Sequence, residues 1–299
     1  MSYQEFSLLR FKKQFSTERS CQRALEKMRW PKGFVCPRCA HTRAYQRAKR
    51  RLLECAGCGY QASLTAGTIF HKTHTPLLKW FWAIYLVSQD KGGISALRLA
   101  KQLELSYKSA WSMLHKIRTA MAQRDSQYTL SGFIEMDDAF FGGVAKGRRG
   151  RGAANKSTVL VMIESKEEHA GFISMQTLDS MKRTEVEPVV KDQIEPGQTI
   201  RTDGFKSFQH LSELGHKHIG TPVPSKQAAE ELPWVHIAIS NAKRFLLGTY
   251  HGVSHKHLQR YLDEFCYRFN RRSWEKQLTS RLMTACLHAN PITFAELKA

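Results

Sequence analysis

Two pairs of cysteines and two aspartates at strand ends are the residues whose types and spacing could do chemistry. The cysteines stand in the motifs CPRC (Cys36, Cys39) and CAGC (Cys55, Cys58), with fifteen residues between the pairs. A CxxC turn places two thiolates on one side of a tight loop, and two such turns close a tetrahedral Zn²⁺ site. Because four protein ligands fill the coordination sphere, this zinc is expected to stabilise the fold and to catalyse nothing.

A redox-active CxxC motif is the alternative, but it needs only one pair and a strand-to-helix context that is missing here. The segment between the pairs is rich in Arg and Lys and carries one tyrosine, which is typical of a solvated hairpin that can touch phosphates. Cys21, Cys266 and Cys286 stand alone and are expected to be packed thiols.

Asp137 lies in the stretch GFIEMDDAFFGG and Asp203 in QTIRTDGF, both of which read as strands. Carboxylate oxygens suit Mg²⁺, or Mn²⁺ in its place. A pair of such ions about 3.5–4 Å apart can activate an attacking water or hydroxyl and stabilise a leaving 3′-oxygen. A single Asp at a strand end is more often a turn or capping residue. Two aspartates in matching contexts, in a chain whose N-terminal half is basic, favour a metal site.

The elements that must position these aspartates alternate between strand and helix. Strands are expected over 132–143, 157–165, 170–178 and 198–205, with helices over 182–194 and 206–215. Three strands followed by helix, strand and helix is the order of an RNase H-like sheet, and other mixed α/β folds stay open. In an RNase H-like sheet the first and fourth strands are neighbours, so Asp137 and Asp203 would converge.

A Gly/Arg-rich loop over residues 144–156 joins the first two of these strands. We expect it to stay mobile until it meets a phosphate backbone, with Arg148, Arg149 and Arg151 as DNA contacts. Further along, a helix is expected to begin at Pro233, a long helix at about Ser254 and a closing helix over 280–298.

The front half reads as helices around the cysteine motifs. Helical periodicity is expected over 16–30 and again, as a buried helix, over 75–89. Two short helices then start at Ser95 and after Ser106, which is the pattern of a helix-turn-helix and also of any helical hairpin. In a helix-turn-helix the first turns of the second helix reach base edges, which gives the expected readers Tyr107, Lys108, Ser109 and Ser112.

The charge of the chain indicates a polyanionic partner. Net charge is +20 with a pI near 9.8, and the excess of Lys and Arg is concentrated in the first 125 residues. Solubility or attraction to a membrane surface is the alternative. No signal peptide is evident, and the most apolar run, residues 77–87, is too short to span a bilayer. We therefore expect no membrane association and a reduced cytoplasmic setting, where paired cysteines favour metal over disulfide.

The motifs CPRC and CAGC, SYKSAWSMLHKIR, IEMDDAFFGG, TDGF and LLGTYHGVSHKHLQRYLDEFCYRFNRR resemble the bacterial insertion-sequence transposases of the fifteen-ninety-five family. These carry an N-terminal zinc ribbon ahead of a DDE-type catalytic domain, and the resemblance covers nearly the whole chain. The family's first two acids fall on Asp137 and Asp203, and Asp138 stands where the family usually has a second acidic residue beside the first.

The resemblance implies an RNase H-like, retroviral-integrase-like core that depends on Mg²⁺ or Mn²⁺. It also implies binding to double-stranded DNA, both the terminal inverted repeats and the target, by a homodimer or higher multimer on paired ends, in a bacterial cytoplasm close to the nucleoid. The expected fold class is thus multidomain. We expect an N-terminal helix and zinc ribbon over 1–72, an all-α helix-turn-helix region over 73–125, and an α/β catalytic domain over 126–299.

The third catalytic residue is the open question, because no Asp or Glu lies between Glu231 and Asp263. In relatives with a full acidic triad, a glutamate opens the helix ahead of GTYH and a lysine follows seven positions later. Counting back from Gly248, these places hold His236 and Lys243. Seven residues are two helical turns, which leaves the two side chains about 20° apart on one face.

We favour His236 as the third metal ligand, although imidazole is a weaker Mg²⁺ ligand than carboxylate. Asn241 is the rival, about 140° further around the helix. A later acid such as Glu264 is a third possibility. An ordinary partly buried histidine is the alternative interpretation of His236, if two aspartates suffice for catalysis.

The sequence thus predicts a DNA transposase that binds its terminal inverted repeats and catalyses metal-dependent strand cleavage and strand transfer. Asp137, Asp203 and His236 would hold the metal, and Lys243 would stabilise phosphate charge. One rival is a catalytically decayed relative that acts as a sequence-specific DNA-binding regulator. Another is a structure-selective nuclease of the same fold, which would cut branched DNA and join nothing.

Overall fold

The computed structural model describes residues 4–47, 52–142, 156–221 and 228–298, and the chain divides into two compact units. One unit holds residues 1–124 together with 274–299, and the other holds residues 125–273. The predicted division between residues 125 and 126 lies next to this boundary. The C-terminal segment, which was expected with the catalytic domain, packs in the first unit instead. Among the described residues, no helix combines the length and apolar character needed to cross a membrane.

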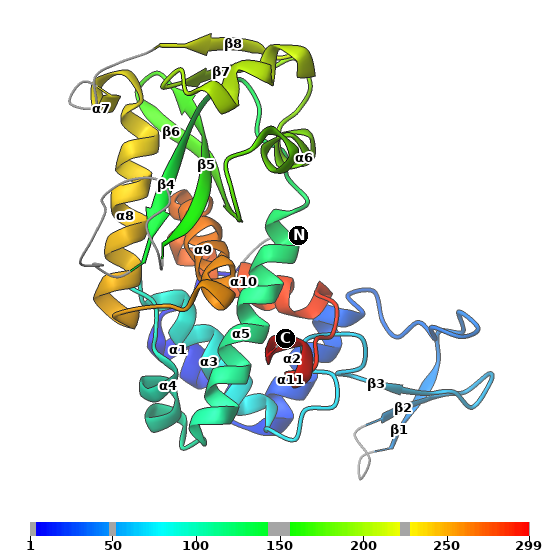
Figure 1. Ribbon diagram of the computed structural model, residues 1–299. Coiled ribbons are helices and arrows are strands. Elements are labelled where there is room, and N and C mark those ends of the chain that lie inside the picture. The colour runs from blue at the N-terminus through cyan, green and yellow to red at the C-terminus, as the bar shows by residue number, and fades with distance from the viewer. Residues whose placement is uncertain (1–3, 48–51, 143–155, 222–227, 299) are drawn as a thin grey trace. The chain divides into compact units, whose positions relative to one another are not determined.

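The first unit consists of helices and a small antiparallel sheet (Figure 1). Its sheet is formed by β1 Ala44–Arg47, β2 Leu52–Cys55 and β3 Gln61–Ser63. Its helices are α1 Leu8–Gln14, α2 Glu18–Arg29, α3 Leu77–Gln89, α4 Ala96–Leu103, α5 Tyr107–Asp125, α10 Leu278–His288 and α11 Phe294–Lys298, with the 3₁₀ helix η3 Arg272–Gln277 at the boundary. The helices predicted over 16–30 and 75–89 are confirmed as α2 and α3.

The single closing helix predicted over 280–298 is wrong, because α10 ends at His288 and α11 begins only at Phe294. Pro291 lies between them, and proline lacks the backbone N–H and disfavours helical geometry in the residue before it.

Two serines cap the helices of the predicted helical pair. Ser95 Oγ accepts from the backbone N–H of Arg98 at 3.2 Å at the start of α4. Ser106 Oγ accepts from the backbone N–H of Ser109, also at 3.2 Å, at the start of α5. Glu104 between the two helices adopts the left-handed conformation at φ 49°. The two helices and the turn between them are therefore as predicted.

The second unit contains a five-stranded mixed sheet and its covering helices (Figure 1). Its elements are β4 Phe133–Phe141, β5 Ser157–Lys166, β6 His169–Leu178, α6 Arg183–Gln193, β7 Thr199–Thr202, the 3₁₀ helix η2 Lys206–Leu214, β8 Lys217–Gly220, α7 Ala228–Glu231, α8 Pro233–Tyr250 and α9 His255–Phe269. The strand order is β6-β5-β4-β7-β8. β4 to β6 run antiparallel, whereas β7 pairs parallel with β4. The predicted adjacency of the first and fourth strands is confirmed.

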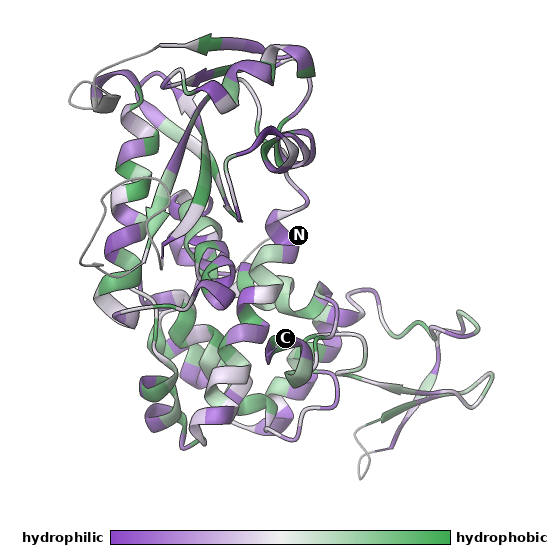
Figure 2. Ribbon diagram, in the orientation of Figure 1, coloured by the Kyte–Doolittle hydropathy of each residue, from purple (hydrophilic) through white to green (hydrophobic). Residues whose placement is uncertain are grey.

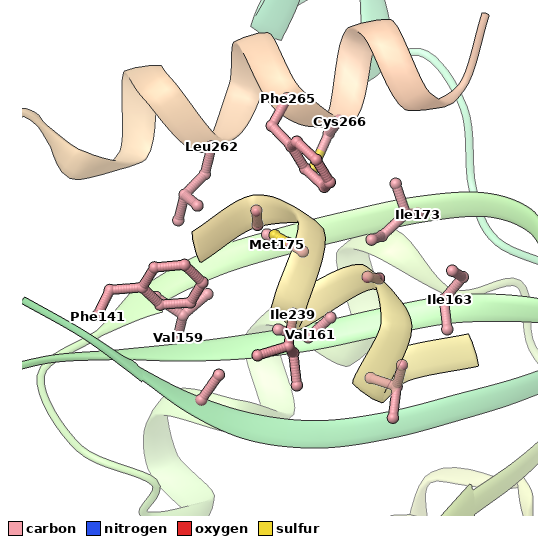
Figure 3. Packing of buried hydrophobic residues seen from close by; sticks show 14 of the residues in the cluster. Phe141, Val159, Val161, Ile163, Ile173, Met175, Ile239, Leu262, Phe265 and Cys266 are labelled. Carbon is pink, nitrogen blue, oxygen red and sulfur yellow. The ribbon is translucent and has the colours of Figure 1, made fainter. Parts of the chain in front are cut away.

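Alternating residues of β4 face opposite sides of the sheet, as the period of two of a strand requires. Ile134 and Met136 pack in the core formed with α6 and η2. Ala139 and Phe141 pack in the core formed with α8 and α9. Figure 3 shows Leu262, Phe265 and Cys266 of α9 directed toward sheet residues of this second core. The banded colouring of α8 in Figure 2 is that of a helix with one buried face.

Gln259 of α9 links this helix to the edge strand β6. Its side-chain amide donates to the carbonyl of Met175 at 2.9 Å, and its carbonyl accepts from the backbone N–H of Thr177 at 2.7 Å. The same amide donates to Asp263 Oδ1 at 2.8 Å. Burial, reinforced by the charge of Asp125, raises the pKa of Asp263 from 3.8 to about 7.

We predict that Asp263 makes stability fall with rising pH. A carboxyl whose folded-state pKa is raised binds its proton more tightly when folded, so stability is lost between about pH 4 and pH 7, by no more than about 4 kcal/mol. Asp263→Asn stays neutral, and its melting temperature is expected to fall less than that of the wild type between pH 5 and pH 8. Asp179→Asn, at an exposed position, is the control. An equal fall in wild type and Asp263→Asn would contradict the assignment.

Candidate functional sites: a four-cysteine cluster and paired aspartates

The four predicted cysteines form one cluster. Cys36 Sγ lies 3.7 Å from Cys58 Sγ, and Cys39 Sγ lies 3.5 Å from Cys55 Sγ. Four sulfurs about 2.3 Å from one tetrahedral ion lie about 3.8 Å apart, whereas a disulfide bond would be about 2.05 Å long. Among the described residues this is the group of three or more metal-binding side chains whose ligand atoms all lie within 4.8 Å. The cluster therefore fits a structural zinc ion.

The turns of the two CxxC motifs direct backbone N–H groups at the sulfurs. The N–H of Arg38 points at Cys36 Sγ and the N–H of Gly57 at Cys55 Sγ, each at 3.4 Å. Such N–H groups stabilise the thiolate form, which is the form that binds metal. Gly59 follows the second motif with φ 68°, a conformation that favours glycine.

Asp137 lies in the middle of β4 on the side of the sheet that α8 and α9 cover. It is two residues before Ala139, which packs in that core, and its residue is only 8% exposed. Its Oδ1 accepts from the backbone N–H of Asp138 at 2.8 Å. Asp138 itself is the next residue of the strand, so it is directed to the opposite side of the sheet.

Asp203 directly follows the last residue of β7. The parallel register pairs Glu135 of β4 with Arg201 of β7, and each of these residues lies two positions before one of the two aspartates. Neighbouring strands are about 4.8 Å apart. A turn then begins: Asp203 Oδ1 accepts from the backbone N–H of Phe205 at 3.0 Å, and Gly204 has φ 77°. Asp203 therefore lies at the end of the strand that neighbours the one carrying Asp137.

His236 of α8 faces Asp137. The two side chains approach to 3.8 Å between His236 Nε2 and Asp137 Oδ2, which is too long for a hydrogen bond. His236 Nε2 is buried and has no hydrogen-bond partner among the described residues. Burial lowers the pKa of His236, the charge of Asp203 opposes this shift, and the charge of Lys243 adds to it. The imidazole is thus held in its neutral form, which is the form that can ligate a metal ion.

Lys243 lies two helical turns after His236 in α8. Burial and the neighbouring charge of Lys156 lower its pKa, while the charge of Asp137 raises it. Its Nζ lies 5.7 Å from the ring centroid of Phe141, the last residue of β4. The ammonium group is therefore an electrostatic neighbour of both Asp137 and His236, at the same side of the sheet.

Asn241 and Glu264, the alternatives to His236 as the third catalytic residue, lie in different surroundings from His236. Asn241 lines, together with His236, Ile237 and Arg244, a surface hollow of about 300 Å³ on α8. Glu264 of α9 is buried and forms an ion pair with Arg268 at 2.8 Å. Its second oxygen accepts from Tyr250 Oη at 3.4 Å. A carboxylate engaged in this way acts in the packing of α9.

The predicted base-reading side chains lie on the first turns of α5. Tyr107 is 58% exposed, and Lys108 is also exposed, with its Nζ 4.8 Å from the ring of Phe294. Ser109 and Ser112 are half-buried. The three arginines predicted to contact DNA, Arg148, Arg149 and Arg151, lie outside the described residues.

Sequence reasoning missed Glu135, a 2% exposed carboxylate of β4. Burial raises its pKa, and hydrogen bonds from the N–H groups of Val235 and Trp234 and from Ser165 oppose that shift. Glu135 precedes Asp137 by two residues and so shares its side of the sheet. An acidic residue two positions before the first aspartate, with the apolar residues Ile134 and Met136 on either side of it, is the signal that could have identified it.

These features define a class of protein: one with a four-cysteine zinc-ribbon-like cluster and a mixed α/β unit carrying paired aspartates. Two family models match. The ISXO2-like transposase domain matches residues 129–270, and the transposase zinc-ribbon domain matches residues 16–61. Both describe IS1595 transposases, and together they cover more than half of the chain. The chain therefore belongs to the IS1595 transposase family, and the resemblance inferred from sequence is confirmed.

The sequence identity to individual relatives is low. The chain is 26% identical over 222 residues to an uncharacterised protein in transposable element ISH50 of Halobacterium salinarum. The aligned region covers 67% of this chain and 72% of that protein. Among solved structures, the Mos1 strand transfer complex matches with a TM-score of 0.29 and 11% identity over 72% of this chain and 78% of that chain. A pre-cleavage Mos1 transpososome matches with a TM-score of 0.25 and 10% identity over 71% and 78%. Likenesses at these TM-scores do not establish a common fold.

We predict that the cysteine cluster carries one zinc ion per chain and that the small sheet depends on it. Zinc content measured by mass spectrometry is expected to fall after Cys58→Ser, together with hydrogen-exchange protection of β1 to β3, because these strands have little apolar core of their own. Cys286→Ala, which removes a buried thiol outside the cluster, is expected to keep its zinc. Full zinc content in Cys58→Ser would contradict the prediction.

Proposed function

We propose that the protein binds the terminal inverted repeats of its insertion sequence and catalyses metal-dependent strand cleavage and strand transfer. The proposal assigns the second unit an RNase H-like, DDE-type catalytic role. The observation that carries it is the buried Nε2 of His236, without a hydrogen-bond partner among the described residues, 3.8 Å from Asp137. Asp203 directly follows the neighbouring parallel strand, and its charge acts on His236.

The donor set fits a divalent metal such as Mg²⁺ or Mn²⁺. Asp137, Asp203 and His236 would hold this ion, and His236 Nε2 lies 3.8 Å from Asp137 Oδ2 without a hydrogen bond between them. Each aspartate has one oxygen engaged by a backbone N–H, which fixes the direction of its carboxylate. When bound, the metal supplies Lewis acidity for activating water and for stabilising a leaving 3′-oxygen.

The residues around this position have distinct roles in the proposed reaction. Asp137 and Asp203 would hold the metal and orient it against the scissile phosphate. His236, neutral because burial lowers its pKa, would supply the third ligand. Lys243 would stabilise the phosphate charge that develops during in-line displacement. The first reaction would hydrolyse a phosphodiester and expose a 3′-OH. The same residues would then act while that 3′-OH attacks a phosphodiester of the target DNA and displaces the target's own 3′-oxygen, which leaves as a 3′-OH.

The first unit would recognise the ends. Its helical pair α4 and α5 would act as a helix-turn-helix, with the start of α5 in the major groove and the zinc ribbon in contact with phosphates. The exposure of Tyr107 and Lys108 supports this role. The functional division into 1–72, 73–125 and 126–299 is part of the proposal, although residues 274–299 pack in the first unit. Action on paired ends as a homodimer or higher multimer, in the bacterial cytoplasm, completes it.

The test is a cleavage and strand-transfer assay on labelled DNA bearing the repeats that flank the gene, with Mg²⁺ or Mn²⁺. Asp203→Ala and His236→Ala are expected to lose at least about 100-fold in nicking at the repeat ends, since each removes a metal ligand. Asn241→Ala, in the same helix and lining the same hollow as His236, is the matched control and is expected to cleave normally.

The outcomes separate the rival assignments. Loss of nicking in Asn241→Ala with full activity in His236→Ala would mean that the third residue is Asn241. Wild-type protein that binds the ends but never nicks or joins under either ion would favour the DNA-binding regulator, as the lack of an acid between Glu231 and Asp263 suggests. Cleavage of branched DNA without any joining would favour the structure-selective nuclease.

Lys243 is expected to act on the transition state and not on metal binding. Lys243→Ala should lower the single-turnover cleavage rate about 10- to 100-fold, because it removes one charge that stabilises phosphate oxygens. The Mg²⁺ concentration for half-maximal rate should change less than about threefold. Lys191→Ala, an exposed lysine on α6 paired with Glu187, is the control. An unchanged rate in Lys243→Ala would remove this residue from the mechanism.

A further inference from the structure

Glu135 connects the central strand to the helix that carries His236. It lies two residues before Asp137 in β4 and is almost completely buried, at 2% exposed. Glu135 Oε2 accepts from the backbone N–H of Val235 at 2.9 Å. Val235 is the third residue of α8 and directly precedes His236. This hydrogen bond joins the strand of the first aspartate to the residue beside His236.

The start of α8 has no cap of its own. The residue before the helix, Leu232, offers no side-chain hydrogen bond, and Pro233 occupies the first position. The first-turn N–H groups of a helix lack partners within the helix, and the partial positive charge there favours a carboxylate. Glu135 supplies that carboxylate from the sheet, so a tertiary contact performs the capping.

Arg201 of β7 holds the segment just before α8 from the neighbouring strand. Arg201 pairs in register with Glu135, and it lies two residues before Asp203 as Glu135 lies two before Asp137. Its Nη1 donates to the carbonyl of Glu231 at 3.4 Å and lies 3.8 Å from the carboxylate of the same residue. Of the two residues that precede the aspartates by two positions, Glu135 therefore contacts the first turn of α8 and Arg201 the end of α7 just before it.

We propose that Glu135 is a positioning residue that fixes the register of α8 against β4, so that His236 faces Asp137 and Asp203. The proposal rests on the proposed function for the metal, whereas the capping contact stands on the geometry alone. The register matters because a slip of one residue along a helix turns a side chain by about 100° and moves it about 1.5 Å. Such a slip would take His236 Nε2 away from Asp137.

Glu135→Ala removes the acceptor, and Glu135→Gln keeps one oxygen that can accept from Val235. Glu164→Ala is the matched control. Glu164 is a buried carboxylate of β5, 4% exposed, and it accepts from the backbone N–H groups of Ser131 and Phe172 at 3.1 and 3.0 Å, away from α8. Removing either carboxylate costs the full-length protein stability. Only Glu135 would affect the His236 position.

Two readouts are measured on the full-length protein without substrate: Mn²⁺ affinity by electron paramagnetic resonance, and hydrogen exchange of the first turns of α8. Glu135→Ala is expected to bind Mn²⁺ about 10- to 100-fold more weakly than the wild type, the range found for residues that orient metal ligands. Exchange over 234–240 should become faster. Glu135→Gln should restore most of both, and Glu164→Ala should alter neither.

Wild-type Mn²⁺ affinity in Glu135→Ala, or an equal loss in Glu164→Ala, would overturn the proposal. Failure of the proposed function is distinguishable: the wild type would then neither bind Mn²⁺ nor cleave repeat ends. In that case the exchange data decide the positioning role on their own. Faster exchange at the start of α8 in Glu135→Ala supports it, and unchanged exchange refutes it.

Discussion

The parallel pairing of β4 with β7 is the constraint on which the second unit depends. Its register sets Glu135 level with Arg201, and each of these residues lies two positions before one of the two aspartates. Parallel pairing needs a crossover between the strands, and here β5, β6 and α6 supply it. The two aspartates are separated by more than sixty residues of sequence and become neighbours only because this crossover returns the chain beside β4.

The two sides of β4 pack against different helices and carry different residue types. The side of β4 toward α6 and η2 carries Ile134 and Met136 in the core, followed by the partly buried Asp138. The side toward α8 and α9 carries Glu135 and Asp137 between Phe133 and the core residues Ala139 and Phe141. Buried carboxylates are costly unless hydrogen-bonded. Backbone N–H groups, from Val235 for Glu135 and from Asp138 for Asp137, offset part of that cost.

Local patterns predicted the elements well, and long-range contacts were the part that could not be predicted. Period-two alternation and turn residues located β4 to β7, and the serines Ser95 and Ser106 located two helix starts, because each signal is contained in a few neighbouring residues. The 3₁₀ geometry of η2 and the packing of α10 in the first unit depend on tertiary contacts. The bond from Glu135 to Val235 joins residues one hundred positions apart, and no local pattern encodes it.

The absence of an acid from α8 changes the electrostatics of the proposed metal position. Two aspartates and a neutral imidazole carry one negative charge fewer than three carboxylates, and Lys243 stands close by. Hard Mg²⁺ loses more from this exchange than ions that accept imidazole readily. The metal affinity that is lost with the negative charge must then come from geometry. A weaker ligand adds affinity only if its donor atom is already held in position at the metal site. A firmly capped α8 is therefore of greater consequence in this chain than in relatives whose helix opens with a glutamate.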